Sequence, residues 1–383
     1  MIRSYHKNLV FTAACIGMSF FGISMITLGA MLPSLVAKLG LSGLQTTSLV
    51  TFLPFGMLIG SLIFGPIVDR FGHKALLVPS CVIVLLGLEG LIFLTSIPLL
   101  QLSIVGIGLG GGILNGETNA LVADISSEAD KGSHLSFLGM FYGLGALGIP
   151  TLLGFLSEYY SYETILQGIS TVMLAGIIFC IPIRFPAPKQ AQGFPVKQGL
   201  GLLKESSLLL LSFILFFQSG IEGVCNNWST SYFGQTTDIP GNQALIALTC
   251  MVAGLTVARM LQVVIFKKIK PETVLPYSLV LTAIGFGMLT FSPGFTRAAV
   301  GMVIIGMGLS ATYPVILSIL GSRYASLSGT AFGIALAIAL VGQATMNGLM
   351  GMISMNMGGI KIYPYMMIAS LIIMLFLFKR SQK

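Results

Sequence analysis

A charged ten-residue segment, Gly65-Pro66-Ile67-Val68-Asp69-Arg70-Phe71-Gly72-His73-Lys74, separates two stretches of almost entirely apolar sequence. Each flanking stretch is long enough to cross the apolar core of a bilayer as a helix, which takes roughly 20 residues. Asp69 can cap a helix N-terminus or pair with a cation, whereas Arg70 and Lys74 favour the cytoplasmic side of a membrane. The pattern predicts a short cytoplasmic loop between two spanning helices.

The whole chain shares this apolar character. Of its 383 residues, 55% are hydrophobic and only 8% are charged, against about 25% charged residues in soluble domains. We therefore expect lipid as the surrounding solvent. The net charge of +8 comes without a basic cluster interleaved with aromatics, so we expect no nucleic-acid partner. The scattered cysteines, and the absence from the sequence of a nucleophile–base pair, metal spacing or phosphate loop, predict a protein that is not an enzyme and has no metal or cofactor.

Twelve apolar stretches predict an all-α membrane protein with twelve transmembrane helices. Their approximate ranges are 9–37, 44–67, 75–96, 98–124, 133–157, 163–183, 206–234, 243–266, 273–292, 296–321, 327–353 and 361–378. The proline- and lysine-containing segment 184–205 cannot continue a helix through lipid. We predict an N-terminal six-helix bundle (1–183), a cytoplasmic linker (184–205) and a C-terminal six-helix bundle (206–383).

The distribution of lysine and arginine predicts the topology. With the N-terminus inside, 16 of the 20 basic residues are cytoplasmic, 3 are external and Arg259 lies within a span. This excess predicts that both termini are cytoplasmic. The short loops are typical of a bacterial inner-membrane protein, which we expect to be a monomer.

The two predicted halves contain similar glycine-rich segments. Gly106–Gly110 opens the fourth span, and Gly306–Ser310 takes the same place in the tenth. An internal repeat in a polytopic chain indicates a transporter, with its substrate site near the midplane between the halves.

The seventh span carries a polar stripe. Gln218, Glu222 and Asn226 are spaced four apart and so share one helix face, and Asn227 and the single tryptophan, Trp228, lie beside them. A carboxylate within a span costs several kcal/mol unless it faces protein or water. The stripe therefore indicates a solute pathway.

The 65–74 segment closely resembles the loop motif of the major facilitator superfamily, through Gly65, Asp69, Arg70, Gly72 and Lys74, with His73 in place of a basic residue. The resemblance implies two pseudo-symmetric bundles and a loop that latches the cytoplasmic gate. At the equivalent place the second half has only Lys267-Lys268-Ile269-Lys270, without the aspartate, so we expect a degenerate latch there.

Three spans resemble the fucose/glucose/galactose proton symporter branch. The similar residues are Gly220-Ile221-Glu222 with Trp228 and Tyr232, Gly108-Leu109-Gly110 with Asn115 and Asn119, and 308–314 in the tenth span. The resemblance implies proton-coupled import of a monosaccharide. Where that branch has a membrane carboxylate, this chain has Asn115, and Glu117 lies about 200° further round the helix.

Glu222 is therefore the first candidate for the proton-coupling residue and Glu117 the second, because a carboxylate in a low-dielectric site can exchange a proton near neutral pH. Sodium stays open as the coupling ion. Amides suit hydroxyl-rich ligands and Trp228 offers a flat face. The substrate-binding candidates are Gln218, Asn226, Asn227, Trp228, Asn115, Asn119, Tyr142, Tyr313, Gln343 and Asn347.

Three other functions stay open. A drug/proton antiporter would carry a glycine–proline motif in the fifth span, which residues 145–150 match poorly. An organic-anion carrier would need Arg259 to face the cavity, whereas Arg259 can also form a structural pair or extend towards the cytoplasm. A non-transporting receptor on the same scaffold would bind ligand without moving it.

Overall fold

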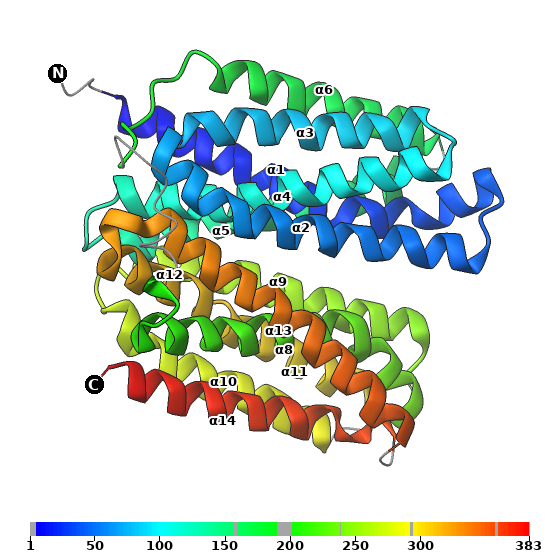
Figure 1. Ribbon diagram of the computed structural model, residues 1–383. Coiled ribbons are helices and arrows are strands. Elements are labelled where there is room, and N and C mark those ends of the chain that lie inside the picture. Colours follow the sequence, from blue (N-terminus) through cyan, green and yellow to red (C-terminus); the bar gives the residue numbers. More distant parts are fainter. Residues whose placement is uncertain are drawn as a thin grey trace. The chain divides into compact units, whose positions relative to one another are not determined.

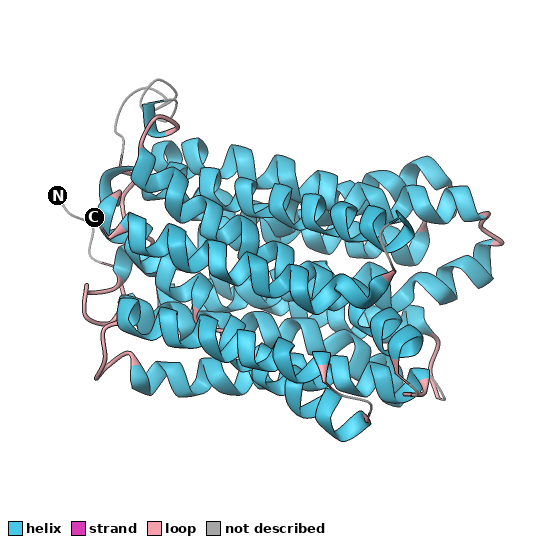
Figure 2. Cartoon of the chain, turned by 90° about the horizontal axis from the view of Figure 1, so that it is seen from below, coloured by secondary structure: helices cyan, strands magenta, loops and turns pink. Residues whose placement is uncertain are grey.

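The fold is entirely helical over the residues described by the computed structural model, which are 5–156, 159–189, 201–237, 239–291, 294–356 and 359–382 (Figure 2). Twelve of the helical stretches are long and apolar enough to span a membrane. The all-α, twelve-helix prediction is confirmed. Residues 190–200 of the predicted linker lie outside the described residues.

The chain forms two compact units that interleave in sequence. Unit 1 comprises Met1–Ile125, Leu138–Leu200 and Tyr324–Ile334, and unit 2 comprises Ser126–Phe137, Gly201–Arg323 and Ala335–Lys383. The first residues of α5 thus pack within unit 2, and those of α13 within unit 1.

The helices follow one another as labelled in Figure 1. The first six are α1 (Lys7–Leu39), α2 (Gly43–Phe71), α3 (Lys74–Phe93), α4 (Ile97–Ile125), α5 (Lys131–Leu156) and α6 (Tyr162–Cys180). The others are α8 (Ser206–Thr236), α9 (Gly241–Ile265), α10 (Pro271–Thr290), α11 (Phe295–Leu309), α12 (Thr312–Arg323), η1 (Ala325–Leu327), α13 (Ser328–Asn356), η2 (Ile360–Ile362) and α14 (Tyr363–Ser381). In unit 1, α4 packs against α1, α2 and α3, and in unit 2, α11 packs against α9 and α10.

The tenth predicted span is broken into two helices. α11 ends at Leu309 and α12 begins at Thr312. Pro314 explains the break, because a proline ring clashes with the carbonyl four residues earlier, here that of Ser310, and offers no N–H to it. At the break, the Ser310 hydroxyl accepts a hydrogen bond from Gln262 Nε2 at 2.5 Å and donates to the Met307 carbonyl at 2.6 Å.

The glycine repeat is real but shifted by two residues from the predicted alignment. Gly108 of α4 leaves no room for a Cβ against the Leu53 carbonyl of α2, as Gly306 of α11 leaves none against the Met251 carbonyl of α9. Gly110 and Gly308 repeat this against α3 and α10, at the carbonyls of Ser80 and Ser278. The contacts therefore pair 108 with 306 and 110 with 308, because close packing on the neighbouring helix fixes the register.

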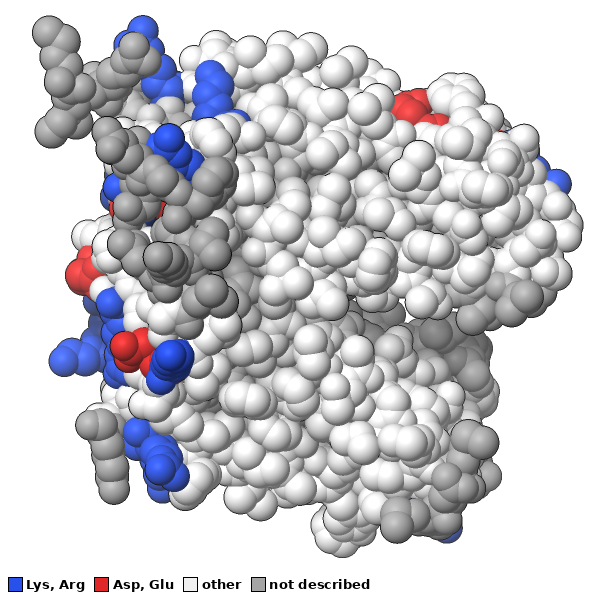
Figure 3. All heavy atoms as spheres, viewed as in Figure 1, with Lys and Arg blue, Asp and Glu red and all other residues white. Residues whose placement is uncertain are grey.

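Lysine and arginine side chains gather at one end of the helices in each unit (Figure 3). In unit 1 this is the end at which α1 begins, and in unit 2 the end at which α14 finishes. We call the end of unit 1 the linker end, because Arg184 to Lys189 follow α6 there.

Candidate functional site

The polar stripe of α8 lies in unit 2. The Gln218 side chain is buried, donates from Nε2 to the Leu309 carbonyl at 3.0 Å, and also hydrogen-bonds to Glu222. Glu222 is partly exposed and interacts electrostatically with Arg259 of α9, a residue that is 7% exposed. The structure thus brings the predicted coupling acid and the only intramembrane arginine predicted from the sequence into one interacting pair.

Further along α8, the polar residues meet α13. Asn226 and Asn227 are exposed, and Asn227 Nδ2 donates to Asn347 Oδ1 at 2.9 Å. Asn347 Nδ2 in turn donates to the Gln343 carbonyl at 2.7 Å. The partly exposed Trp228 ring lies against Gly351 of α13. Amide groups, an indole face and Glu222 therefore share one pair of helices.

Tyr313 adds a hydroxyl to unit 2, since it hydrogen-bonds to Ser219 of α8. The remaining substrate candidates lie in unit 1. Asn119 Nδ2 donates to the carbonyl and side-chain oxygens of Asn115, at 2.7 and 3.3 Å. The Tyr142 ring packs at 5.2 Å, centre to centre, on Phe21. The contacts given for unit 1 join Asn115 to Asn119 but do not join either residue to Tyr142.

The predicted latch motif caps a helix in unit 1. Asp69, 2% exposed, accepts hydrogen bonds from Thr330 N (2.9 Å), Thr330 Oγ1 (2.6 Å) and Gly329 N (3.3 Å) at the start of α13. A carboxylate there satisfies orphan N–H groups and complements the helix dipole. We call Gly65, Asp69, Gly329 and Thr330 the α2–α13 junction.

The other motif residues lie around this junction. Gly72 ends α2 with φ 82°, a left-handed conformation that favours glycine. Arg70 lies over the Phe71 ring, and Lys74 Nζ donates to the Ile181 carbonyl at 2.5 Å. The Lys74 hydrogen bond holds the start of α3 near the end of α6.

Glu117 belongs to a buried charge cluster at the linker end of unit 1. His73 Nδ1 lies 3.2 Å from Glu117 Oε1, and His73 Nε2 lies 3.1 Å from Asp124 Oδ2. Lys189 Nζ lies 2.7 Å from Asp124 Oδ1. Burial alone lowers the pKa of His73, but the hydrogen bonds and charges of Asp124 and Glu117 outweigh it and raise the pKa from 6.5 to about 9. We call His73, Glu117, Asp124 and Lys189 the histidine cluster.

Unit 2 contains a second junction, without a buried carboxylate. At the start of α5, Ser133 Oγ donates to the Val263 carbonyl of α9 at 2.7 Å, and Ser136 Oγ donates to Gln262 Oε1 at 3.3 Å. Gly132 packs on the Pro271 ring. We call this set the α5–α9 junction.

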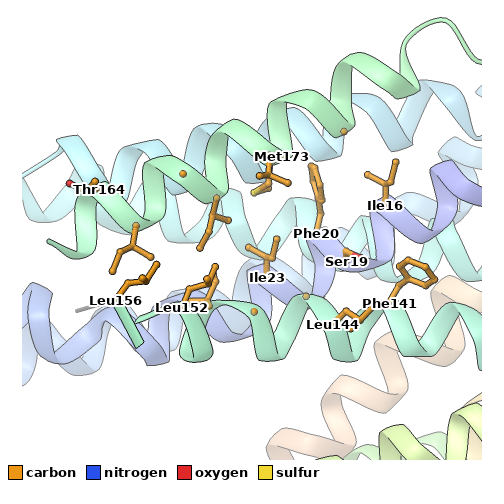
Figure 4. A pocket seen from close by; sticks show the side chains of 18 of the residues that line it. Ile16, Ser19, Phe20, Ile23, Phe141, Leu144, Leu152, Leu156, Thr164 and Met173 are labelled. Carbon is orange, nitrogen blue, oxygen red and sulfur yellow. The ribbon is translucent and has the colours of Figure 1, made fainter. Parts of the chain in front are cut away.

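Unit 1 also has an apolar groove of about 760 Å³ between α5 and α6, with α1 as its floor (Figure 4). Its lining residues include Ile16 and Phe20 of α1 and Thr164 and Met173 of α6. None of the predicted site residues lines it.

The sequence did not lead us to predict that the residues of the histidine cluster lie together. Its signals were His73 in the place of a permanent cation, and Asp124 seven residues after Glu117, two helical turns along the same face of α4. Lys189 gave no signal, because only the folded chain brings it to Asp124.

A comparison with known protein families identifies this architecture. The family model of the Major Facilitator Superfamily matches residues 12–344. The chain belongs to this superfamily. It is therefore a membrane transporter by family, and not an enzyme.

Related sequences match the chain over about half its length. The uncharacterized MFS-type transporter Rv1877 of Mycobacterium tuberculosis is 25% identical over 53% of this chain and 29% of its own. The inner membrane transport protein YdiN of Escherichia coli is 24% identical over 48% and 44%. Multidrug resistance protein 1 of Bacillus subtilis is 24% identical over 47% and 46%. The chain thus spans less than half the length of these relatives.

Solved structures share the fold along nearly the whole chain. The transporter FucP in the outward conformation gives a TM-score of 0.83 at 16% identity, covering 97% of this chain and 98% of its own, and FucP is the fucose:proton symporter of E. coli. The proton:xylose symporter XylE gives 0.81 at 15%, covering 98% and 95%. The human organic anion transporter MFSD10 gives 0.76 at 15%, covering 98% and 100%.

Proposed function

We propose that this chain is a secondary active transporter that moves a small polar solute, a monosaccharide, together with a proton by alternating access. The observation that carries the proposal is the exposed Asn227–Asn347 amide pair between α8 and α13, with Asn226 and Trp228 beside it. Amides offer both donors and acceptors to sugar hydroxyls, and an indole face packs well against a sugar ring.

Glu222 supplies the proposed coupling. When ionised, it pairs with Arg259. A proton on Glu222 ends that attraction and frees the Gln218–Glu222 region of α8 to adjust to the sugar. Loading both from one side and releasing both on the other completes the cycle. The resemblance to FucP and XylE supports this reading through the fold they share with the chain.

The arrangement of Arg259 bears on the organic-anion alternative. Arg259 is buried and interacts electrostatically with Glu222, so an anionic solute would have to compete with that carboxylate. Exposed amides also suit neutral hydroxyl-rich solutes better than the lipophilic cations of an antiporter. We therefore propose a neutral sugar as the transported solute, rather than an anion or a lipophilic cation.

Trp228 provides the test, as the chain's single tryptophan. Purified protein in detergent is titrated with neutral sugars, sugar acids and lipophilic cations at two pH values while Trp228 fluorescence is followed. We expect a saturable change with one neutral sugar, stronger at the lower pH and weakened in Glu222→Gln. Glu89→Gln, which changes an intramembrane acid of unit 1, is the matched control. A response only to sugar acids supports the anion carrier instead, and one only to cations supports the antiporter.

A further inference from the structure

The histidine cluster joins three separate parts of the sequence within unit 1. His73 is the residue before α3, Glu117 and Asp124 belong to α4, and Lys189 follows α6. The His73 side chain is 7% exposed and the Glu117 side chain 0%. Ions buried this deeply are stable only when they are paired and hydrogen-bonded.

The geometry assigns the charge of His73. Both of its ring nitrogens face carboxylate oxygens, at 3.2 and 3.1 Å. A neutral imidazole donates from one nitrogen only, and an ionised carboxylate can only accept. His73 is therefore an imidazolium that bridges two carboxylates, in keeping with its pKa of about 9.

The charges of the cluster then balance only with Lys189. One imidazolium and two carboxylates leave a net charge of −1, which the Lys189 ammonium at 2.7 Å from Asp124 neutralises. Without Lys189, the buried site needs one other positive charge.

In the part of the chain that the structure describes, the ion pairs of Glu117 and Asp124 are those with His73 and Lys189. Lys74 of α3 donates to the Ile181 carbonyl. Asp69 of α2, which caps the start of α13, also interacts electrostatically with Lys189. Cys81 of α3 and Cys180 of α6 lie near Glu117 as buried thiols.

Glu117 has an atom free to take a proton. Its Oε1 accepts from His73, whereas its Oε2 is fully buried and has no hydrogen-bond partner among the described residues. An ionised oxygen left without a donor is costly to bury, and a proton on it removes the larger part of that cost, the buried charge.

We propose that His73, Glu117 and Asp124 form a proton-binding site in which a proton on Glu117 and the ammonium of Lys189 on Asp124 compete. The proton comes from solvent and binds Glu117 Oε2, while Lys189 leaves with its own charge, so the cluster stays neutral throughout. Linkage is reciprocal, so protonation undocks Lys189 and docked Lys189 opposes protonation.

This exchange acts on the α2–α13 junction. Lys189 Nζ donates to Ser328 Oγ at 2.5 Å, and Ser328 Oγ donates to Asp124 Oδ1 at 2.9 Å. Ser328 directly precedes the residues that Asp69 caps. Departure of Lys189 therefore loosens the first residue of α13. The site does not depend on which solute the transporter carries, nor on coupling through Glu222.

Two measurements on the purified full chain test the proposal. Infrared difference spectroscopy follows the protonated carboxyl band between mildly alkaline and mildly acidic buffer. A nitroxide at Ala187→Cys reports on the docking of Lys189, in a Cys250→Ser background because the other four cysteines are buried. We expect acid to produce the band and to raise the ratio of mobile to immobile label about fivefold, the lower end of usual coupling strengths. A label at Ser96→Cys, at the other end of unit 1, should not respond.

Substitutions at Glu117, Glu222 and Lys189 test whether the proton and Lys189 compete. Glu117→Gln should remove one carboxyl band and the pH response of the label, whereas Glu222→Gln should leave the label's response intact. If the label ignores pH, or responds equally in Glu117→Gln, the proposal is wrong. Should Glu117→Gln fail to fold, Lys189→Gln, a change at a partly exposed residue, replaces it. In that variant the Glu117 band should already be present at neutral pH, and a spectrum unchanged from that of the unaltered protein would overturn the proposal.

Discussion

The two helix junctions solve the same packing problem with different chemistry. In unit 1, the end of α2 meets the start of α13 through the Asp69 carboxylate. In unit 2, the end of α9 meets the start of α5 through hydroxyl, carbonyl and amide groups, beginning with Ser133 and the Val263 carbonyl. A hydrogen bond to a charged group contributes about 1.5–3 kcal/mol, and a neutral one about 0.5–1.5 kcal/mol. We infer that the response to pH resides in the α2–α13 junction, while the α5–α9 junction acts as a neutral contact.

The largest effect is expected from removing the Asp69 carboxylate. Asp69→Ala leaves the buried N–H groups of Gly329 and Thr330 without their acceptor, and should destabilise the protein by about 3 kcal/mol. Thermal unfolding in detergent measures this. Glu205→Ala is the control, because Glu205 is exposed and its side chain makes no capping hydrogen bond at the start of α8. Equal melting temperatures for the two variants would remove the distinction between the junctions.

Each junction contains one closely packed glycine, so the same glycine-to-alanine substitution can be compared at both. A Cβ at Gly65 would lie 2.6 Å from the Gly329 carbonyl oxygen and 2.7 Å from Thr330 Cα, both backbone atoms. A Cβ at Gly132 would lie 2.6 Å from Pro271 Cγ, the edge of a ring that can shift. Gly65→Ala should therefore cost about 1–3 kcal/mol, typical of overpacking, and Gly132→Ala less, as measured by the same unfolding assay. A greater loss in Gly132→Ala would contradict this account.

Alkaline pH should destabilise the folded chain through His73 of the histidine cluster. Its folded pKa of about 9 lies above its ordinary 6.5, so its stabilising contribution is fully present below pH 6.5 and is lost as the pH rises through 9. Melting temperature measured across this window should fall. In His73→Arg, whose cation does not titrate there, the fall should be smaller. An identical pH profile in His73→Arg would show that another group is responsible.

The smallest effect is expected at the α5–α9 junction. Ser133→Ala removes one neutral hydrogen bond to the Val263 carbonyl and should cost about 1 kcal/mol. The unfolding midpoint should move only slightly, with the same slope against pH as in the unaltered protein. A loss as large as that of Asp69→Ala would show that unit 2 depends on its junction just as strongly.

Sequence alone predicted the fold because apolar length and proline placement determine what crosses a membrane. The twelve spans follow from these. The break near Ser310 was not predicted, because the tenth span was expected to be one helix over 296–321, although Pro314 accounts for it. Helical geometry also predicted that Glu117 faces away from Asn115, and in the structure Glu117 contacts His73 while Asn115 is partly exposed.

Partners distant in the sequence could not be predicted. The capacity of Asp69 to cap a helix was evident, but its partner is 260 residues away. The sequence left several roles open for Arg259, among them a structural pair. Only the packing of α8 on α9 brings Arg259 close to Glu222. The division into two six-helix bundles at 184–205 and the roles of the substrate residues stay predictions.

Transport in proteoliposomes tests the central claim most directly. Uptake of a panel of radiolabelled monosaccharides is measured with and without an imposed inward proton gradient, for the unaltered protein, Glu222→Gln and the control Glu89→Gln. We predict gradient-driven accumulation of one sugar by the unaltered protein and Glu89→Gln, and only exchange without accumulation by Glu222→Gln. Full accumulation by Glu222→Gln would contradict coupling through Glu222, and no flux of any neutral sugar would contradict the proposed solute.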